Sequence, residues 1–401
     1  MPRSDRPMMP LAITGVGCVS ALGHSAEEVL DALESGRSGI EPLPADEMQG
    51  CEARLAARVN EFDSTAYLPA MRARRLERAS IFAVAAVQQA LRHGDFPDGD
   101  ERHERLGLVL GTSSAGSVPL TTFLAAAFES SPRDAPPSEF PNTVANAPAG
   151  HVSIELGLRG PSTTFTQKQS VVAPALLYSQ LMIGSGRCDA VVVGATDEWC
   201  EVYQRGYEQL KALRIQNGRA SREGIVLAEG AATLLLESEV LIARRSTRPL
   251  ARLLGVAATS SPGPPHHWVN DPDALARAID QALHRAALAP ADVGSVWLGA
   301  NGISSLESME AKAIARIFSD HPLAATGVKG ALGEAAVSGA ASVALAALAR
   351  RRGRLPAFAG TPAIEWPPSV RVLKSPSALP AGATLVLTYG AGGTFGAVLL
   401  G

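Results

Sequence analysis

Cysteine, long apolar runs and concentrated positive charge are all scarce in this sequence. Only four of the 401 residues are cysteine, and their spacing matches neither a disulfide framework nor a paired metal site (Cys18, Cys51, Cys188 and Cys200). No apolar run approaches the roughly 20 residues that cross a bilayer. The net charge is −3 and no block of basic residues occurs, which disfavours nucleic acid as a partner. We therefore expect a cytoplasmic protein without a metal site.

The start of the chain offers no targeting or cofactor signal either. Residues 1–10 contain arginines but no apolar segment, so no signal peptide is expected. Residues 11–20 form an apolar run with Gly15 and Gly17, yet no third glycine opens a helix and no P-loop lysine follows. We interpret this run as a buried strand and a tight turn, and we predict no cofactor.

What the chain does contain is an alternation of strands and helices. Hydrophobic residues make up 46% of the sequence and charged residues 19%, as in a globular protein with one large core or two. The first half predicts strands at 106–110 and 189–196 and helices at 25–36, 71–93 and 149–158. The second half predicts strands at 251–257, 295–299, 370–373, 384–389 and 395–400 and helices at 273–287, 307–318 and 338–350. This alternation predicts an α/β fold in layers, with halves 1–247 and 248–401.

A strand, a sharp turn and a helix follow one another after Gly160. Residues 163–166 are β-prone, the pattern breaks at 167–169, and a helical pattern covers 175–183. The free N–H groups at a helix N-terminus favour negative charge that develops beside them, and enzymes place nucleophiles on such elbows. The residue at this elbow is Gln169, whose side-chain amide is not a nucleophile.

This region resembles the nucleophile region of the β-ketoacyl-ACP synthases, which have the thiolase fold. The resemblance rests on Gly160-Pro161-Ser162, on the elbow, and on the segment 186–195. Counting from either end assigns the cysteine position of the family to Gln169. The opening strand and the turn at 38–40 also resemble the start of these synthases. The resemblance implies a duplicated α-β-α-β-α sandwich of five layers, although the two halves show no residue-level repeat.

Two further catalytic positions and the gate position of the family are also altered. The place of the first family histidine holds Asn301, and the place of the second holds Glu334. Lys329, which precedes the second position in the family motif, is retained. The gating phenylalanine is replaced by Ala391, and all eight histidines of the chain lie elsewhere.

Condensation needs each group that is missing. A thiolate must take the acyl chain, and two imidazole donors stabilise the enolate that forms when malonyl-ACP loses CO₂. A carboxylate at Glu334 would repel that enolate unless protonated, and Asn301 offers only one neutral donor group. The resemblance therefore implies no functional catalytic residue. We expect Glu334 to form an internal ion pair with Lys329 that holds the old site shut.

Glutamine at the cysteine position marks two kinds of protein in the resembled family. One is the chain-length factor of type II polyketide synthases, a non-condensing partner of an active ketosynthase. The other is a decarboxylase of modular assembly lines, which supplies the starter unit and keeps its histidines. Because this chain lacks both histidines, the resemblance favours a chain-length factor, an inactive homologue that works within a ketosynthase heterodimer. The decarboxylase and a purely structural scaffold remain alternatives.

The resemblance also implies partners and a tunnel. In the family the segment equivalent to 140–150 lies at the dimer interface and lines the acyl tunnel. We therefore expect an obligate active ketosynthase partner, bound through 140–150 and 163–166, and an acyl carrier protein bound transiently. The expected tunnel and interface residues are Phe140, Asn142, Thr143, Val144, Asn146 and Trp199. Segment 140–150 lacks the aromatic-rich run associated with aromatic polyketides, which favours a polyene product such as an aryl polyene.

Two groups of residues allow two interpretations each. The arginines of segment 71–93 could bind an acidic carrier protein or form a solvated helix face, and the solvated face is the commoner case. Trp199, Tyr203 and Tyr207 follow a predicted strand and could line a pocket or belong to the core.

Overall fold

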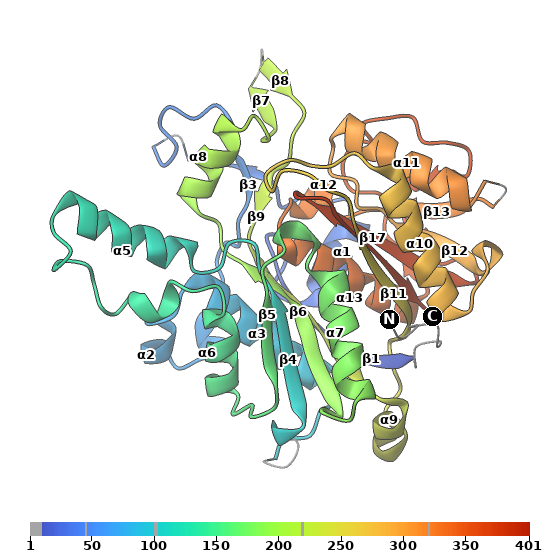
Figure 1. Cartoon of the computed structure of the whole chain (residues 1–401), viewed down its shortest axis with the longest axis horizontal. Helices are drawn as coiled ribbons and strands as arrows, with labels where there is room; N and C mark the ends of the chain where they lie inside the picture. The colour runs from blue at the N-terminus through green and yellow to red at the C-terminus, as the bar shows by residue number, and fades with distance from the viewer. Residues whose placement is uncertain (1–9, 45, 100–102, 218–219, 320) are drawn as a thin grey trace.

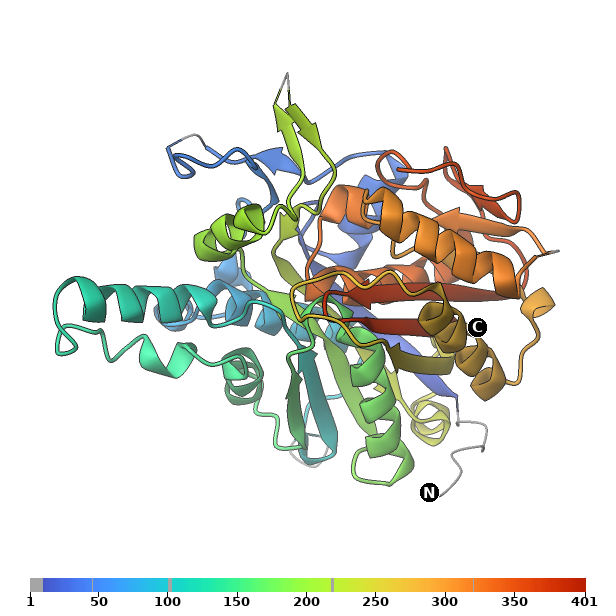
Figure 2. The same cartoon turned by 45° about the horizontal axis from the view of Figure 1, so that its top comes forward.

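The computed structural model describes residues 10–44, 46–99, 103–217, 220–319 and 321–401. The prediction that residues 1–10 form no signal peptide therefore lies almost wholly outside the described residues. Within these ranges, no helix combines the length and the apolar character needed to cross a bilayer. Figures 1 and 2 show strands in the middle of the molecule and helices around and between them.

One mixed sheet of 11 strands runs through the molecule. From edge to edge its strands are β15 (Val370–Val372), β13 (Leu323–Thr326), β12 (Val293–Trp297), β17 (Ala383–Gly390), β18 (Thr394–Leu400), β11 (Ala251–Ser260), β1 (Leu11–Val19), β10 (Gly230–Glu237), β6 (Ala190–Asp197), β4 (Leu106–Gly111) and β5 (Ser162–Phe165). Most of these strands are buried along their whole length, which explains their nearly continuous apolar sequences.

The two ends of this sheet repeat one topology. In the first half β5, β4 and β6 are parallel, and β10 and β1 continue the sheet antiparallel. In the second half β13, β12 and β17 are parallel, and β18 and β11 continue it in the same way. The halves meet where Leu11–Ile13 of β1 pairs with Ala251–Leu253 of β11. The predicted duplication is therefore present in the strand order, although the sequence shows no repeat.

Helices complete the layers (Figure 2). α7 (Val172–Gly184) and α13 (Ala336–Arg352) contact strands of both halves and form the central layer with α1 (Ala26–Glu34). α3 (Arg78–His93) and α6 (Ala147–Glu155) cover the outer side of the first half, and α10 (Pro272–Ala286) and α11 (Ser304–Ile317) cover that of the second. α13 is buried from Ala336 to Ala349 because its alanine, glycine and serine side chains let the neighbouring layers approach closely. The predicted five-layer α/β fold is confirmed.

Short elements connect these layers. They are β2 (Glu41–Pro42), β3 (Leu55–Ala57), η1 (Ser64–Ala66), α2 (Ala70–Ala73), α5 (Ser117–Glu129), η2 (Phe140–Asn142), η3 (Lys168–Ser170), α8 (Glu201–Gln209), β7 (Ile215–Asn217), β8 (Ala220–Arg222), β9 (Leu227–Ala228), α9 (Glu239–Arg245), η4 (Pro290–Asp292), α12 (Lys329–Leu332), β14 (Arg354–Leu355) and β16 (Ser377–Ala378).

Two features differ from the sequence prediction. The helix predicted over 71–93 is broken into α2 and α3, because Glu77 is extended and the side chain of Asn142 binds the carbonyl of Arg75 in place of a helical N–H. α5 was not predicted. It begins after Gly116, whose φ of +82° favours glycine, and it projects from the body of the molecule (Figures 1 and 2).

Candidate functional site

The elbow forms as predicted, with Gln169 at its turn. β5 ends at Phe165, Gln169 lies in η3, and α7 begins at Val172. Lys168 has a φ of +55°, an unusual conformation for a residue other than glycine that lets the chain reverse sharply. Gln169 is 3% exposed, so its side chain faces the interior.

Both ends of the Gln169 amide are held by hydrogen bonds. Its Nε2 donates to the hydroxyl of Tyr207 at 3.3 Å, and its Oε1 accepts from the backbone N–H of Ala391 at 3.2 Å. A backbone N–H beside an elbow could otherwise stabilise an oxyanion. At this elbow the side chain of Gln169 uses that donor, and the predicted gate residue Ala391 supplies it.

Asn301, Lys329 and Glu334 meet in one buried cluster. Lys329 Nζ lies 2.8 Å from Glu334 Oε1, with both side chains at most 3% exposed, so the predicted internal ion pair is present. Asn301 Nδ2 donates to Glu334 Oε2 at 3.1 Å. Burial raises the pKa of Glu334, and the lysine and the amide oppose that shift. The carboxylate therefore engages both donor groups, and a substrate would have to compete with it for them.

A second buried carboxyl lies behind this cluster. Glu310 accepts from the backbone N–H of Gly299 at 2.7 Å and from the hydroxyl of Tyr389 at 3.2 Å. Burial raises the pKa of Glu310 to about 8 and also raises that of Tyr389. Lys329 Nζ stands 5.2 Å from the centre of the Tyr389 ring, which connects the two groups. Sequence reasoning missed both residues, because a lone glutamate in a helical pattern carries no sign of its burial.

Little space remains beside Gln169. The cavity that Gln169 and Glu334 line has a volume of only about 20 Å³, enough for about one water molecule. Trp199 and Tyr207 also line it, and both pack against a hydrophobic cluster. Both interpretations of these aromatic residues therefore apply. The cavity has no room for an acyl chain.

The predicted tunnel residues lie elsewhere. Phe140 and Val144 are 63% and 47% exposed; Thr143 lies between them in the chain, and Asn146 follows Val144. Asn142 is buried and binds the Arg75 carbonyl and the His151 ring. Of the six predicted residues, only Trp199 lines the cavity at Gln169.

An exposed apolar surface surrounds this segment. We call it the α5 face, and it comprises Val118, Leu120, Leu124, Phe128, Phe140, Val144 and Ile154. Phe140 packs against Phe123 of α5, with ring centres 5.8 Å apart. The edge strand β5 packs beside α6, and in the described part of the chain it pairs only with β4. An apolar surface beside an open strand edge is typical of a protein interface.

A metal centre has no candidate in the described part of the chain, since no three histidine, cysteine, aspartate or glutamate side chains are grouped suitably. The four cysteines are buried and unpaired. Burial raises the pKa of the Cys18 thiol to about 12, so Cys18 cannot replace the missing nucleophile.

Comparisons with known proteins match both halves of the chain to one family. Residues 8–240 match the model of the "Beta-ketoacyl synthase, N-terminal domain", and residues 250–361 match the "Beta-ketoacyl synthase, C-terminal domain". A curated relative, 3-oxoacyl-[acyl-carrier-protein] synthase 2 of Coxiella burnetii, is 27% identical over 364 residues, which cover 86% of this chain and 87% of the relative.

Solved structures share the fold at lower identity. The ishigamide ketosynthase/chain length factor superposes with a TM-score of 0.88 at 22% identity, covering 98% of this chain and 99% of the other. A second match comes from a structure titled as a type II PKS acyl-carrier protein in complex with its ketosynthase. It superposes with a TM-score of 0.87 at 19% identity and covers 98% of this chain and 99% of the matched chain.

Proposed function

The chain belongs to the β-ketoacyl synthase family, with its thiolase-like fold, and we propose that it is a non-condensing chain-length factor of a type II polyketide synthase. In this role it pairs with an active ketosynthase and shapes the tunnel that receives the growing acyl chain. The observation that carries the proposal is the state of the elbow. Gln169 stands there, and its amide occupies the backbone donor of Ala391.

The buried cluster supports the same proposal. An enolate from malonyl-ACP needs neutral or positive donors aimed at it. Here the carboxylate of Glu334 accepts a hydrogen bond from the Nδ2 of Asn301 and forms an ion pair with the ammonium of Lys329. A substrate would have to break a buried ion pair to reach them, which costs several kcal/mol. The chain therefore lacks both the nucleophile and the enolate-stabilising groups of a condensing enzyme.

The α5 face and the edge of β5 are the surfaces we assign to the partner. Their apolar side chains suit an obligate interface, for which we expect a buried area above about 2,000 Å². One structural neighbour is named as a ketosynthase/chain length factor and another as an acyl-carrier protein complex. We propose the same kinds of partner for this chain, with the carrier protein bound only transiently.

The product that we propose is a polyene, such as an aryl polyene. Phe140, Asn142, Thr143, Val144 and Asn146 lie on the α5 face or next to it. In the heterodimer they would cap the tunnel of the partner. The cavity at Gln169 is too small for a chain of its own, so the acyl chain belongs to the partner in this proposal.

Intact-mass measurements test this function. The purified chain, alone and with a candidate active ketosynthase partner, is mixed with malonyl-ACP. We expect no acyl adduct on this chain and no loss of CO₂ above background without the partner. We also expect a stable complex with that ketosynthase.

Two results would favour the alternatives. Decarboxylation by this chain alone, abolished by Gln169→Ala, would identify a decarboxylase that supplies the starter unit. If the complex forms and its product length stays the same for every substitution on the α5 face, this chain would be a structural scaffold. A stable monomer without affinity for any neighbouring ketosynthase would contradict the proposal outright.

A further inference from the structure

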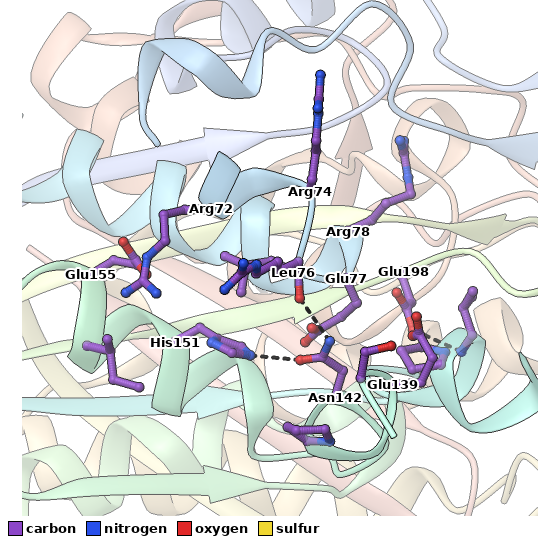
Figure 3. A pocket seen from close by; sticks show the side chains of 16 residues that line it. Arg72, Arg74, Leu76, Glu77, Arg78, Glu139, Asn142, His151, Glu155 and Glu198 are labelled. Atoms are coloured by element: carbon purple, nitrogen blue, oxygen red, sulfur yellow. Dashed lines mark hydrogen bonds and ion pairs between the residues drawn. The ribbon is translucent and has the colours of Figure 1, made fainter. Parts of the chain in front are cut away.

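A wide cavity lies beneath α5, beside the small space at Gln169. Its volume is about 780 Å³, and its walls come from the link between α2 and α3, the start of α5, η2 and α6 (Figure 3). Glu198 lines both this cavity and the space at Gln169, so the two adjoin. Val118 and Ile154 line it too, and both belong to the exposed α5 face. The mouth of the cavity therefore lies at the surface that we assign to the partner.

Two buried carboxyl groups line the interior of this cavity. Glu77 is 8% exposed, and its Oε1 accepts from the hydroxyl of Ser80, whereas its buried Oε2 has no hydrogen-bond partner. Glu198 is 2% exposed and accepts from the backbone N–H of Val118 at 3.0 Å. A buried acceptor without a donor costs free energy unless a ligand or water supplies one. Glu77 Oε2 is therefore open to a hydrogen bond from a ligand or a water molecule, and burial raises the pKa of this carboxyl.

A third acceptor follows from the hydrogen bonds of Asn142. Its Nδ2 donates to the Arg75 carbonyl at 3.1 Å, so its Oδ1 must accept from His151 Nε2 at 2.8 Å (Figure 3). Burial lowers the pKa of His151, which keeps the ring neutral. The other nitrogen, Nδ1, is then an acceptor. Glu77, Glu198 and His151 thus each bring an acceptor to the lining of the cavity.

Charged side chains of both signs line the cavity, and their charges nearly cancel. Arg72 pairs with Glu155 at 2.9 Å and Arg78 pairs with Glu229 at 2.6 Å, so these two are neutralised by carboxylates. Arg74 and Arg75 also line the cavity. In Figure 3 the side chain of Arg74 points away from the carboxyl group of Glu77. Beyond these pairs the lining holds Arg74 and Arg75 against Glu77, Glu139 and Glu198, so the charges of the two signs nearly balance and a neutral donor fits better than an ion.

We propose that this cavity receives the far end of the acyl chain that grows on the partner subunit, and that it selects a chain end bearing a hydroxyl group. The inference rests on the proposed function. A hydroxyl donates to a carboxylate and accepts from a protonated carboxyl. It therefore fits both forms of Glu198, whose pKa burial raises to about 7. The walls formed by Leu76, Val118 and Pro119 suit the apolar chain behind that hydroxyl.

Competition between matched starters tests the selection. The reconstituted heterodimer receives carrier-protein thioesters in pairs that differ only in the terminal hydroxyl: 4-hydroxyphenyl against phenyl, and ω-hydroxyalkyl against alkyl. We expect the hydroxyl-bearing member to be extended about three to ten times faster, as one hydrogen bond to a buried acceptor implies. The first pair reports a phenol and the second an aliphatic alcohol.

Isosteric substitutions locate the effect. Glu77→Gln and Glu198→Gln each keep one acceptor oxygen and replace the other with a donor. Each should bring the ratio of the two extension rates, with and without the terminal hydroxyl, close to one. Glu155→Gln is the matched control, because Glu155 lines the same cavity but is paired with Arg72. Gel filtration verifies that each heterodimer stays assembled.

The outcomes separate this inference from the proposed function. An assembled complex that condenses but shows no hydroxyl preference, or keeps it in both variants, overturns the inference and leaves the function standing. Faster extension of an amine-terminated starter would also overturn it. If no heterodimer forms, the proposed function itself fails.

Discussion

The identity of residue 169 determines which chemistry the elbow can perform. One substitution tests whether a cysteine at this position is enough to restore condensation. Gln169→Cys supplies a thiol but leaves Asn301 and the Lys329–Glu334 ion pair in place. We expect no condensation above background, because the enolate still finds no free donors. The measurement is product formation from acyl- and malonyl-ACP with this chain alone, and the active partner serves as positive control. Condensation by the single variant would contradict the assignment of Asn301 and Glu334.

The buried carboxyl of Glu310 makes stability depend on pH. Its pKa is about 8 in the folded protein, against 4.5 as the ordinary value, so the folded state binds more protons between these limits. The contribution of Glu310 to stability is then fully present below pH 4.5 and is lost as the pH rises towards 8. Wild type should lose about 1 kcal/mol per pH unit more than Glu310→Gln in this window.

Urea unfolding between pH 5.5 and 8 measures this difference. The exposed Glu201, which pairs with Arg205, provides the control substitution Glu201→Gln, whose pH profile should follow wild type. If the free energy of unfolding changes with pH in the same way for wild type and Glu310→Gln, the pKa of Glu310 is not raised in the folded protein.

At the scale of single elements, α5 is the part that we expect to bind the partner. Leu124 and Phe128 are 38% and 83% exposed on a helix that projects from the body. A charge placed in an apolar interface must be desolvated without a partner, at a cost of several kcal/mol. Leu124→Glu or Phe128→Glu should therefore weaken the heterodimer about a hundredfold or more.

Light scattering after co-purification measures assembly in these variants. Val240→Glu is the matched control, because Val240 is equally apolar and 60% exposed but lies on α9, far from α5 in Figure 1. Loss of assembly in the control alone would move the interface to the other side of the molecule.

The turn after α5 should influence product length. Phe140 packs against Phe123 and is 63% exposed, so its ring is free to contact a partner. Phe140→Ala removes that ring, and a tunnel capped there becomes longer. We expect longer products by mass spectrometry from the reconstituted complex, and an unchanged distribution from Val240→Ala. If wild type and Phe140→Ala give the same product lengths while the complex stays intact, Phe140 does not line the tunnel.

At the scale of the molecule, we propose that the chain divides into halves 1–247 and 248–401 that cannot fold separately. The first half contributes five strands and the second half six, and five strands of each half share one topology. One hydrophobic cluster nevertheless includes Leu30 and Leu176 of the first half and Leu345 and Val386 of the second. Either half alone would expose this surface to water, at about 25 cal/mol per Å².

Expression of the two halves tests this coupling. Each half alone should be insoluble or lack cooperative unfolding, and co-expression should recover a complex with the circular dichroism spectrum of the intact chain. A half that unfolds cooperatively by itself would show that the shared cluster is not required.

The local elements and the place of the elbow could be predicted from the sequence alone. Alternating apolar runs and helical periodicity depend on near neighbours, which is why the predicted strands and most predicted helices appear within a few residues of their observed limits. The motifs around Gln169, Asn301 and Glu334 are local in the same sense. The ion pair of Glu334 with Lys329 could be expected because both belong to one short motif.

Only the tertiary structure decided the contacts between distant segments. Ala391 and Tyr207 bind Gln169 from two distant parts of the chain, and the cavity that adjoins Glu198 combines α2, α5 and α6. The break before α3 likewise depends on Asn142, which lies far along the chain from Arg75. Such contacts result from how the layers pack, and no local pattern of residue types encodes which side chain will be buried without a partner.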